Sequence, residues 1–245
     1  MKEVRIGVIG CGGMGRALAQ TLKEIEGARV VACADSDEGR ARELAEEFGA
    51  RAFSDYRDLL ALDEVDAVVV ATPGFLHEEM VVASARAGKH IFCEKPMAFS
   101  VASCDRMIAA AEKAGVKLMI GQVLRYIPRF AKIREIVDSG VLGDPFGISI
   151  VRMGGGWGAG NVHWRRRKDM VGGVLFEVSV HELDFMCCIM GDVERVAAFT
   201  GRYVLEGIDY EDTAQVLLRF RNGGIGSLVA GISSAIGVYE GKVLC

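Results

Sequence analysis

The first half of the chain alternates short apolar runs with longer amphipathic stretches. The apolar runs are bounded by Gly, Pro or Asp, as buried parallel strands are, and they fall at Val4–Ile9, Arg29–Ala34, Ala67–Ala71, His90–Cys93 and Val116–Ile120. Helical periodicity occupies the intervals, at Gly13–Glu26, Glu38–Phe48, Leu76–Ala87 and Ser100–Ala114. This alternation predicts an α/β domain, built as a doubly wound parallel sheet with right-handed crossovers.

The pattern changes after Gly121-Gln122. An amphipathic helix, Pro128–Ser139, precedes longer alternating runs, and one further helix, Phe176–Met190, interrupts them. The alternating runs are Phe146–Met153, Arg195–Tyr203, Thr213–Phe220 and Gly224–Ala230. We therefore predict a Rossmann domain over residues 1–122 and an α+β domain on an open, mostly antiparallel sheet over residues 123–245.

The composition and net charge of the chain indicate which classes of binding partner it is suited to. Of the 245 residues, 51% are hydrophobic and 25% charged, and the net charge is −4, so no strongly basic face favours nucleic acid or an anionic membrane. A small substrate fits better. The seven cysteines are an odd number with no C-x-x-C, and no signal peptide or long apolar run is evident. These features predict reduced thiols, no membrane contact and a cytoplasmic protein.

A glycine-rich loop follows the first predicted strand, in "RIGVIGCGGMG". Its glycines fit G-x-G-x-x-G at a strand-to-helix turn, and Asp35 ends the second strand 20 residues after Gly15. This context predicts a dinucleotide site in which the helix N-terminus binds the pyrophosphate and Asp35 the ribose hydroxyls. The carboxylate favours NAD, although Arg40 leaves NADP open. The loop residues assigned to the cofactor are Gly10, Gly12, Gly13, Met14 and Gly15.

A second motif, "IFCEKPM", ends the fourth predicted strand. Proline forces the residue before it into extended backbone, so Lys95 stays at the strand end and outside the following helix. An ammonium partly desolvated near a positive nicotinamide ring would have a lowered pKa and could serve as an acid, a base or a hydrogen-bond donor. The alternative is a surface lysine paired with Glu94.

The predicted helix of the second domain carries Glu177, His181 and Asp184 at i, i+4 and i+7, which places all three on one helical face. A carboxylate beside an imidazole can hold its tautomer and stabilise its cation, so Glu177 and His181 read as a general-base dyad. Two alternatives remain open: a divalent metal site without an evident fourth ligand, and a structural histidine.

Several of these motifs resemble the glucose-fructose oxidoreductase/inositol dehydrogenase (Gfo/Idh/MocA) family. The matching runs are "ATPGFLHEEMVVASARAGKHIFCEKPMA", "GQVLRYIPRF", "GGVLFEVSVHELDFM" and "EDTAQVLLRFRNGGIGSL", so the resemblance covers nearly the whole chain. It implies an NAD(P)-dependent oxidoreductase acting on a carbinol of a sugar or cyclic polyol. It also implies a homo-oligomer formed through the C-terminal sheet.

The resemblance implies roles for individual residues. Lys95 would approach the nicotinamide and the substrate hydroxyl, and a cis bond before Pro96 is one way to aim it into the cleft between the domains. His181 would remove the hydroxyl proton. The remaining matches are Thr72, Pro73 and Glu94 on the cofactor side and Arg125 and Asp184 on the substrate side. Two positions depart from the family pattern, Glu177 in place of Asp and Gly74 in place of Asn.

Three further sites have a weaker functional interpretation, and each also has a structural one. Trp164 either walls the substrate pocket or belongs to the core, and Arg125 either contacts substrate or forms a salt bridge. The basic run 165–168 is either a solvated loop or a contact for an acidic substrate, and His77 reads as structural.

The chain ends at "VYEGKVLC", before the last strands expected of the family, so we expect a shortened or truncated member with an incomplete second sheet. The alternative function is that of a non-catalytic, dinucleotide-binding regulatory protein. The presence of both Lys95 and His181 disfavours it, because a protein that only binds the dinucleotide needs neither residue. Within the enzyme class, an imine, a diketone or a nucleotide sugar remains open as substrate.

Overall fold

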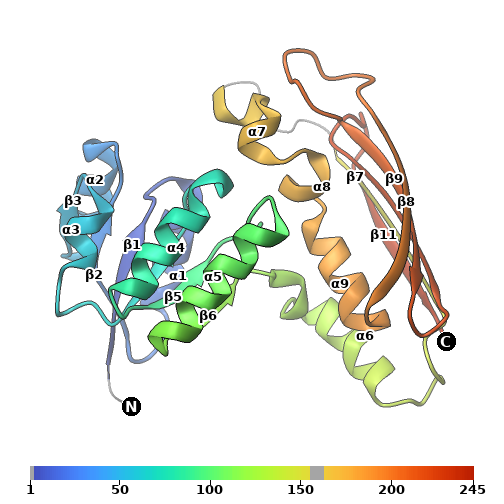
Figure 1. The fold of residues 1–245 in the computed structure, drawn as a ribbon, viewed down its shortest axis with the longest axis horizontal. Helices are drawn as coiled ribbons and strands as arrows, with labels where there is room; N and C mark the ends of the chain where they lie inside the picture. The colour runs from blue at the N-terminus through green and yellow to red at the C-terminus, as the bar shows by residue number, and fades with distance from the viewer. Residues whose placement is uncertain (1–2, 155–162) are drawn as a thin grey trace. The chain divides into compact units, whose positions relative to one another are not determined.

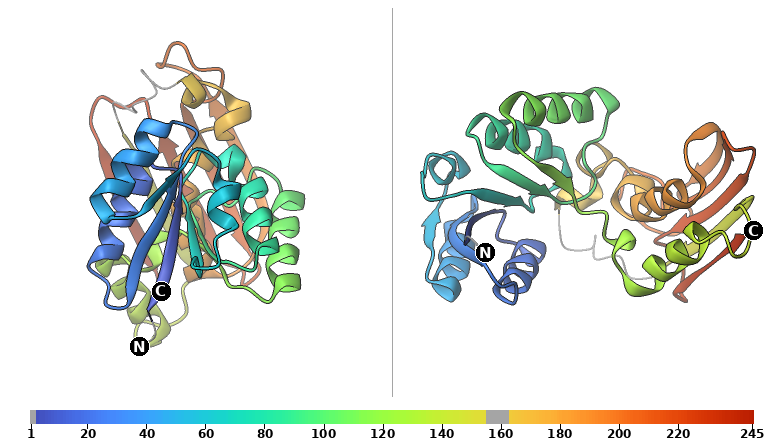
Figure 2. Two further views of the ribbon diagram at one scale, coloured as in Figure 1. Left: turned by 90° about the vertical axis from the view of Figure 1, so that its left-hand side faces the viewer. Right: turned by 90° about the horizontal axis from the view of Figure 1, so that it is seen from below.

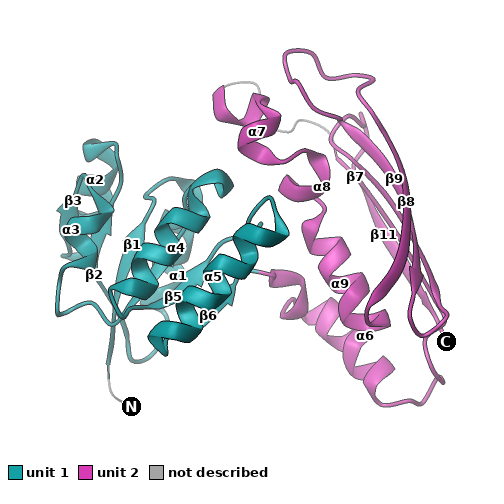
Figure 3. Cartoon of the chain, viewed as in Figure 1, with its two compact units in different colours: residues 1–121 teal, residues 122–245 magenta. Residues whose placement is uncertain are grey.

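The structure is a computed structural model that describes residues 3–154 and 163–245. The chain divides into two compact units, residues 1–121 and 122–245 (Figures 1 and 3). In the described ranges, no helix is long and apolar enough to cross a membrane.

Unit 1 is built on a six-stranded parallel sheet with strand order β3-β2-β1-β4-β5-β6 (Figure 1). The strands are β1 (Val4–Ile9), β2 (Ala28–Ala34), β3 (Arg51–Phe53), β4 (Ala67–Val70), β5 (His90–Cys93) and β6 (Leu118–Ile120). The predicted doubly wound sheet is confirmed. The strand order reverses between β1 and β4, and ligands of such sheets bind at the carboxyl ends of the strands on either side of that point. Only β3, a short edge strand, had no counterpart in the apolar pattern.

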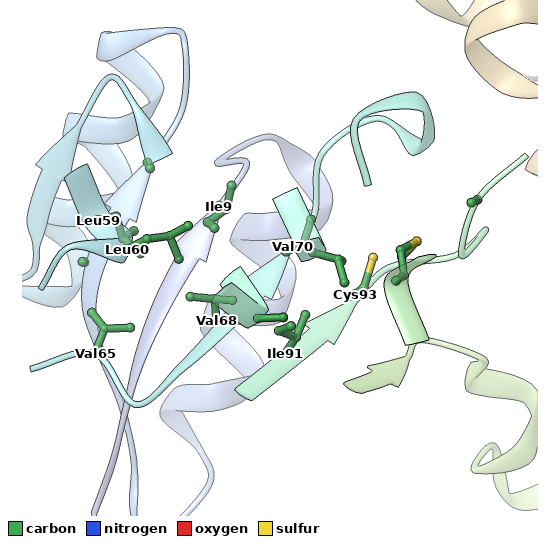
Figure 4. Close-up of a cluster of buried hydrophobic side chains, with 14 residues drawn as sticks. Ile9, Leu59, Leu60, Val65, Val68, Val70, Ile91 and Cys93 are labelled. Carbon is green, nitrogen blue, oxygen red and sulfur yellow. The ribbon is translucent and has the colours of Figure 1, made fainter. Parts of the chain in front are cut away.

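The helices of unit 1 cover both faces of this sheet. They are α1 (Gly13–Lys23), α2 (Glu38–Phe48), α3 (Tyr56–Leu60), α4 (His77–Arg86) and α5 (Val101–Ala114), with a 3₁₀ turn at η1 (Gly74–Leu76). Consecutive residues of β1 alternate between the two layers. Val8 packs with residues of α1 and α2, whereas Ile9 joins the cluster of Val81 in α4 and Met107 in α5 (Figure 4).

Local sequence signals explain where these helices begin and end. Asp37 caps α2 by accepting hydrogen bonds from the backbone N–H groups of Gly39 and Arg40, and Gly49 ends the helix in the left-handed conformation. Ser100 likewise caps the start of α5, and Gly115 ends that helix in the left-handed conformation. The observed bounds of both helices accordingly lie close to those the sequence predicts.

Unit 2 is a five-stranded sheet with helices on one face (Figure 2). The strand order is β11-β7-β10-β9-β8, in which β7 and β10 are parallel and the other pairs antiparallel. The strands are β7 (Gly147–Met153), β8 (Val193–Gly201), β9 (Thr213–Phe220), β10 (Ile225–Gly231) and β11 (Val238–Leu244). The predicted open, mostly antiparallel sheet is confirmed, and β11 is an additional strand that pairs with β7.

Two long helices, α6 (Pro128–Asp138) and α9 (Val180–Met190), pack on this sheet. The rings of Phe130 and Phe185 meet edge to face at 4.9 Å between centroids. The short helices of unit 2 are η2 (Val123–Arg125), η4 (His163–Arg166), α7 (Lys168–Val171) and α8 (Val174–Glu177).

A buried ion pair ties α9 to the sheet. The fully buried Glu182 carboxylate lies 2.9 Å from Arg152 Nη1 in β7, and the Tyr239 hydroxyl of β11 donates to it at 2.7 Å. The same Arg152 nitrogen donates to the Val178 carbonyl oxygen at 2.8 Å. Removing one partner of such a pair typically costs about 3–5 kcal/mol, because it leaves a buried charge uncompensated. This network therefore sets the position of α9, which carries His181 and Asp184, on the strands beneath it.

Candidate functional site

Two glycines of the β1–α1 loop are required by the backbone itself. Gly10 has φ +92°, and a Cβ there would lie 2.8 Å from the Ala71 carbonyl carbon. A Cβ at Gly15 would lie 1.8 Å from the Gly10 carbonyl oxygen. A side chain at either position would separate the loop from its neighbours.

Two other glycines of the same loop leave space for a ligand. Apart from the glycine itself, the adjacent residues of the chain and the nearby backbone of α1, no described atom lies within 4 Å of the position that a Cβ would take at Gly12 or Gly13. Gly12 is the N-cap of α1, and no described side chain caps that helix end. Its first N–H groups and the positive end of the helix dipole fit a phosphate group, and Met14 lies exposed in the same turn.

Asp35 connects the end of β2 to the glycine loop. Its Oδ2 accepts a hydrogen bond from the Cys11 N–H at 2.8 Å, and its Oδ1 accepts one from the Asp37 N–H at 2.9 Å. The carboxylate is thus held beside the loop at the carboxyl end of the sheet. Arg40, the potential partner of a 2′-phosphate, forms an exposed ion pair with Asp37 at 3.3 Å.

The segments after β4 and β5 complete this edge of the sheet. Thr72 and Pro73 follow β4, and the glycine loop approaches them where Gly10 contacts Ala71 and Thr72. The Lys95 N–H donates to Glu94 Oε2 at 3.1 Å, and the Glu94 side chain is buried. The Lys95–Pro96 peptide bond is cis, which is the option that the sequence left open. Unit 1 therefore gathers all of the predicted cofactor residues at the carboxyl ends of β1, β2, β4 and β5.

In unit 2, two of the three residues predicted to contact substrate pair with each other. Arg125 in η2 donates from Nε and Nη2 to the two carboxylate oxygens of Asp184 in α9, at 2.7 and 2.6 Å. This bidentate pair raises the pKa of the Arg125 guanidinium, since the Asp184 carboxylate stabilises its charge. The salt bridge that the sequence left open for Arg125 is therefore present.

The prediction that Glu177, His181 and Asp184 share one helical face is wrong for Glu177. The expected helix Phe176–Met190 is broken, because α8 ends at Glu177 and α9 begins at Val180. Ser179 adopts φ −101° and ψ 8° as the N-cap of α9. Valine and serine at positions 178 and 179 are weak helix formers, although the Ser179 side chain makes no capping hydrogen bond in the described residues. His181 and Asp184 remain together on α9.

Glu177 and its neighbours in the basic run form local ion pairs. The Glu177 carboxylate lies 3.7 Å from Arg165 Nε, and the Arg165 guanidinium stacks over the Trp164 ring at 5.0 Å. Trp164 packs against the apolar cluster around Val174 and Tyr210, as a core residue does. Further along the run, Arg167 pairs with Asp169 and Lys168 with Glu211, so their charges are neutralised within the chain.

Sequence reasoning gave His77 no more than a structural role, yet the structure places it beside the cofactor segments. Its ring contacts the carbonyl oxygens of Thr72 and Pro96. A signal was present: a histidine that follows a strand end and a T-P dipeptide, at the start of a helix, lies where α/β sheets bind ligands.

Comparison with known proteins covers both units. Residues 4–122 match a family model described as "Oxidoreductase family, NAD-binding Rossmann fold", and residues 130–243 match the "GFO/IDH/MocA C-terminal domain". The chain is 36% identical to myo-inositol 2-dehydrogenase of Thermotoga maritima, over 98% of this chain and 73% of the relative. It is 34% identical to an uncharacterised oxidoreductase of Streptococcus pneumoniae, over 89% of this chain and 60% of that protein.

Solved structures show the same fold. The structure of GenD2 from gentamicin A biosynthesis in complex with NAD superposes with a TM-score of 0.92 at 28% identity, and covers 100% of this chain and 70% of GenD2. The chain thus spans between three fifths and three quarters of the length of these three proteins.

Proposed function

Because this chain belongs to the GFO/IDH/MocA family of oxidoreductases, which have an NAD-binding Rossmann fold, we propose that it transfers a hydride between a nicotinamide dinucleotide and a carbinol carbon of a sugar or cyclic polyol. The 36% identity to a myo-inositol 2-dehydrogenase supports this substrate class.

One observation carries the proposal. Lys95 follows β5 at the same sheet edge as the open glycine loop and Asp35, and this is the edge at which such sheets bind dinucleotides. A protein that only binds a dinucleotide needs no acid, base or hydrogen-bond donor for a reacting oxygen at this position. The space at Gly12 and Gly13, the uncapped start of α1 and the carboxylate of Asp35 fit the pyrophosphate and the ribose.

The chemistry divides between cofactor and protein. When bound, a nicotinamide ring supplies the hydride acceptor or donor. Oxidation of the carbinol removes a hydride from its carbon and a proton from its oxygen, leaving a carbonyl group. We assign His181 as the base that accepts this proton. We assign Lys95 as the donor of a hydrogen bond to the reacting oxygen. Glu177, the last residue of α8, is proposed to position His181 across the break between α8 and α9 and not along one helical face. Arg125 and Asp184 are proposed as a paired substrate contact.

The experiment that tests this function measures the formation of reduced nicotinamide by the purified protein. NAD and NADP are supplied separately with a panel of cyclic polyols and aldoses. Turnover of at least one panel member supports the dehydrogenase. Tight cofactor binding without turnover on the whole panel would instead favour the non-catalytic, regulatory function.

Asp35 is expected to set the preference for NAD over NADP. Its carboxylate would accept the ribose hydroxyls of NAD and repel the 2′-phosphate of NADP. Replacing Asp35 with serine should therefore lower the ratio of NADPH to NADH dissociation constants by about 10-fold or more, since like charges in contact cost several kcal/mol. The fluorescence of bound NADH and NADPH reports both constants.

The control for this experiment is Glu38→Gln, which removes an exposed carboxylate three positions along the chain. The control should leave the ratio unchanged. A ratio that also stays unchanged in Asp35→Ser would contradict the role of Asp35.

We further propose that the chain forms a homo-oligomer through the sheet of unit 2. On the sheet face opposite α6 and α9, the apolar side chains of Phe199, Leu217 and Ile225 are 86%, 63% and 56% exposed. Such a patch is typical of an interface. Light scattering should give a mass above 26.4 kDa for the wild-type chain, and Leu217→Glu should lower it. A wild-type chain that is monomeric at high concentration argues against this interface.

A further inference from the structure

The His77 side chain is enclosed between two segments of the proposed cofactor edge. His77 is the first residue of α4, and its side chain is fully buried. Its Nδ1 lies 2.8 Å from the Pro96 carbonyl oxygen, and its Nε2 lies 2.9 Å from the Thr72 carbonyl oxygen. One ring thus spans the segment after β4, with Thr72 and Pro73, and the segment after β5, with Lys95 and Pro96.

The two segments also touch directly next to this ring. A Cβ at Gly74 would lie 3.3 Å from Pro96 Cδ and 3.0 Å from the Phe99 ring. Glycine permits this close approach but brings no side chain that could hydrogen-bond across it. The imidazole of His77 supplies a polar link at the same junction.

Both neighbours of the ring are carbonyl oxygens, which only accept hydrogen bonds. A neutral imidazole has one N–H, so it donates to one carbonyl and turns a lone pair toward the other, whereas an imidazolium donates to both. The pKa of His77 is lowered below its ordinary value, mainly because the ring is buried. The contacts with the two carbonyl oxygens act in the opposite direction and raise this pKa, but they do not outweigh burial. The Lys95 charge also lowers this pKa, so the ammonium and the ring interact electrostatically.

We propose that His77 is a positioning residue that, by hydrogen bonding across the Thr72 and Pro96 carbonyls, holds Lys95 in register with the cofactor-side segment Thr72-Pro73. This inference rests on the proposed function. The ring itself exchanges no proton with substrate; it determines where the Lys95 ammonium lies.

The first test uses the wild-type protein without substrate or cofactor. In ¹⁵N-histidine NMR spectra, the His77 ring should show an N–H proton that exchanges slowly with solvent. At least one ring nitrogen should have the shift of a hydrogen-bonded donor. Rapid exchange and a shift like that of a solvated histidine would overturn the proposal, whatever the enzyme does.

The second test follows Lys95 directly after reductive ¹³C-methylation of the lysines, with Lys95→Met used to assign its signal. His77→Leu, which keeps bulk but removes both polar contacts, should shift the Lys95 signal and its titration midpoint. His77→Gln, whose amide group still donates, should restore values near those of wild type. His90→Leu is the matched control, because His90 is an exposed histidine at the other end of β5. A Lys95 signal unmoved in His77→Leu would contradict the proposal.

The third test compares turnover with binding. With the best substrate of the panel, His77→Leu should lower kcat by about 10–100-fold, since a misplacement of about 1 Å can cost 10²-fold. The dissociation constant of NADH should rise much less, and His77→Gln should recover most of the rate. Equal losses in both variants would indicate a merely structural residue. A wild-type chain without turnover would count against the proposed function, while the two NMR tests would still decide the role of His77.

Discussion

Replacing Lys95 with methionine is expected to lower kcat for polyol oxidation by about 10²–10³-fold, the loss typical when a hydrogen-bond donor to the reacting oxygen is removed. Methionine keeps the length of the side chain but can neither carry charge nor donate a hydrogen bond. The backbone at this position should stay in place, because the Lys95 N–H still donates to the buried Glu94 carboxylate. The measurement is steady-state formation of NADH, alongside the dissociation constant of NADH from fluorescence.

The matched control for this variant is Lys113→Met, which removes an exposed lysine from α5 in the same unit. The control should retain wild-type kcat. If the Lys95 variant kept more than a third of the wild-type rate while binding NADH normally, Lys95 would be a solvated surface residue and not a catalytic one. A parallel loss of NADH binding would instead assign Lys95 mainly to the cofactor.

Replacing His181 with asparagine is expected to lower kcat by about 10²–10⁴-fold, because no group then takes the hydroxyl proton at neutral pH. The helix should remain in position, since the contacts of Glu182 with Arg152 and Tyr239 hold α9 on the sheet. Because the proposed cofactor residues all lie in unit 1, NADH affinity should change by less than about threefold. The assay is the same, with thermal unfolding as a check on the fold.

His90→Asn serves as the control for this variant, because it makes the same change at an exposed histidine. Glu177→Gln then separates positioning from catalysis. If Glu177 orients His181, its replacement should shift the pH profile of kcat with a smaller loss of rate. An unchanged profile would exclude Glu177 from the positioning of His181. A fully active His181→Asn protein would remove His181 from the mechanism.

Unit 1 could be predicted closely because its signals are local. The glycine loop follows from glycine at position 10, where the backbone has φ +92°. Strand β1 follows from an unbroken apolar run, and helix α2 from its N-cap residue, Asp37. The apolar strand pattern sufficed because every central strand is buried on both faces. The edge strand β3 escaped prediction because it has little apolar surface to bury.

The arrangement of unit 2 depended on contacts that no sequence period reveals. The periodicity of apolar residues ran through positions 178 and 179, yet the chain breaks there, and Arg152 of β7 binds the freed Val178 carbonyl oxygen. The same guanidinium neutralises Glu182, and Tyr239 of β11 completes the network. The helical periodicity that predicted one face for Glu177 and His181 contains no information about Arg152 or Tyr239, which lie on strands β7 and β11.

The sequence by itself determined the fold class, the dinucleotide loop and the residue types available for chemistry, because these depend on local backbone preference and on the period of the apolar residues. Only the tertiary structure decided which of those residues meet: Arg125 with Asp184, Glu177 with Arg165, and His77 with the carbonyls of Thr72 and Pro96. The physical reason is that hydrogen bonds and ion pairs act over about 3–4 Å, between groups that can lie far apart in the chain, as Arg125 and Asp184 do at 59 positions.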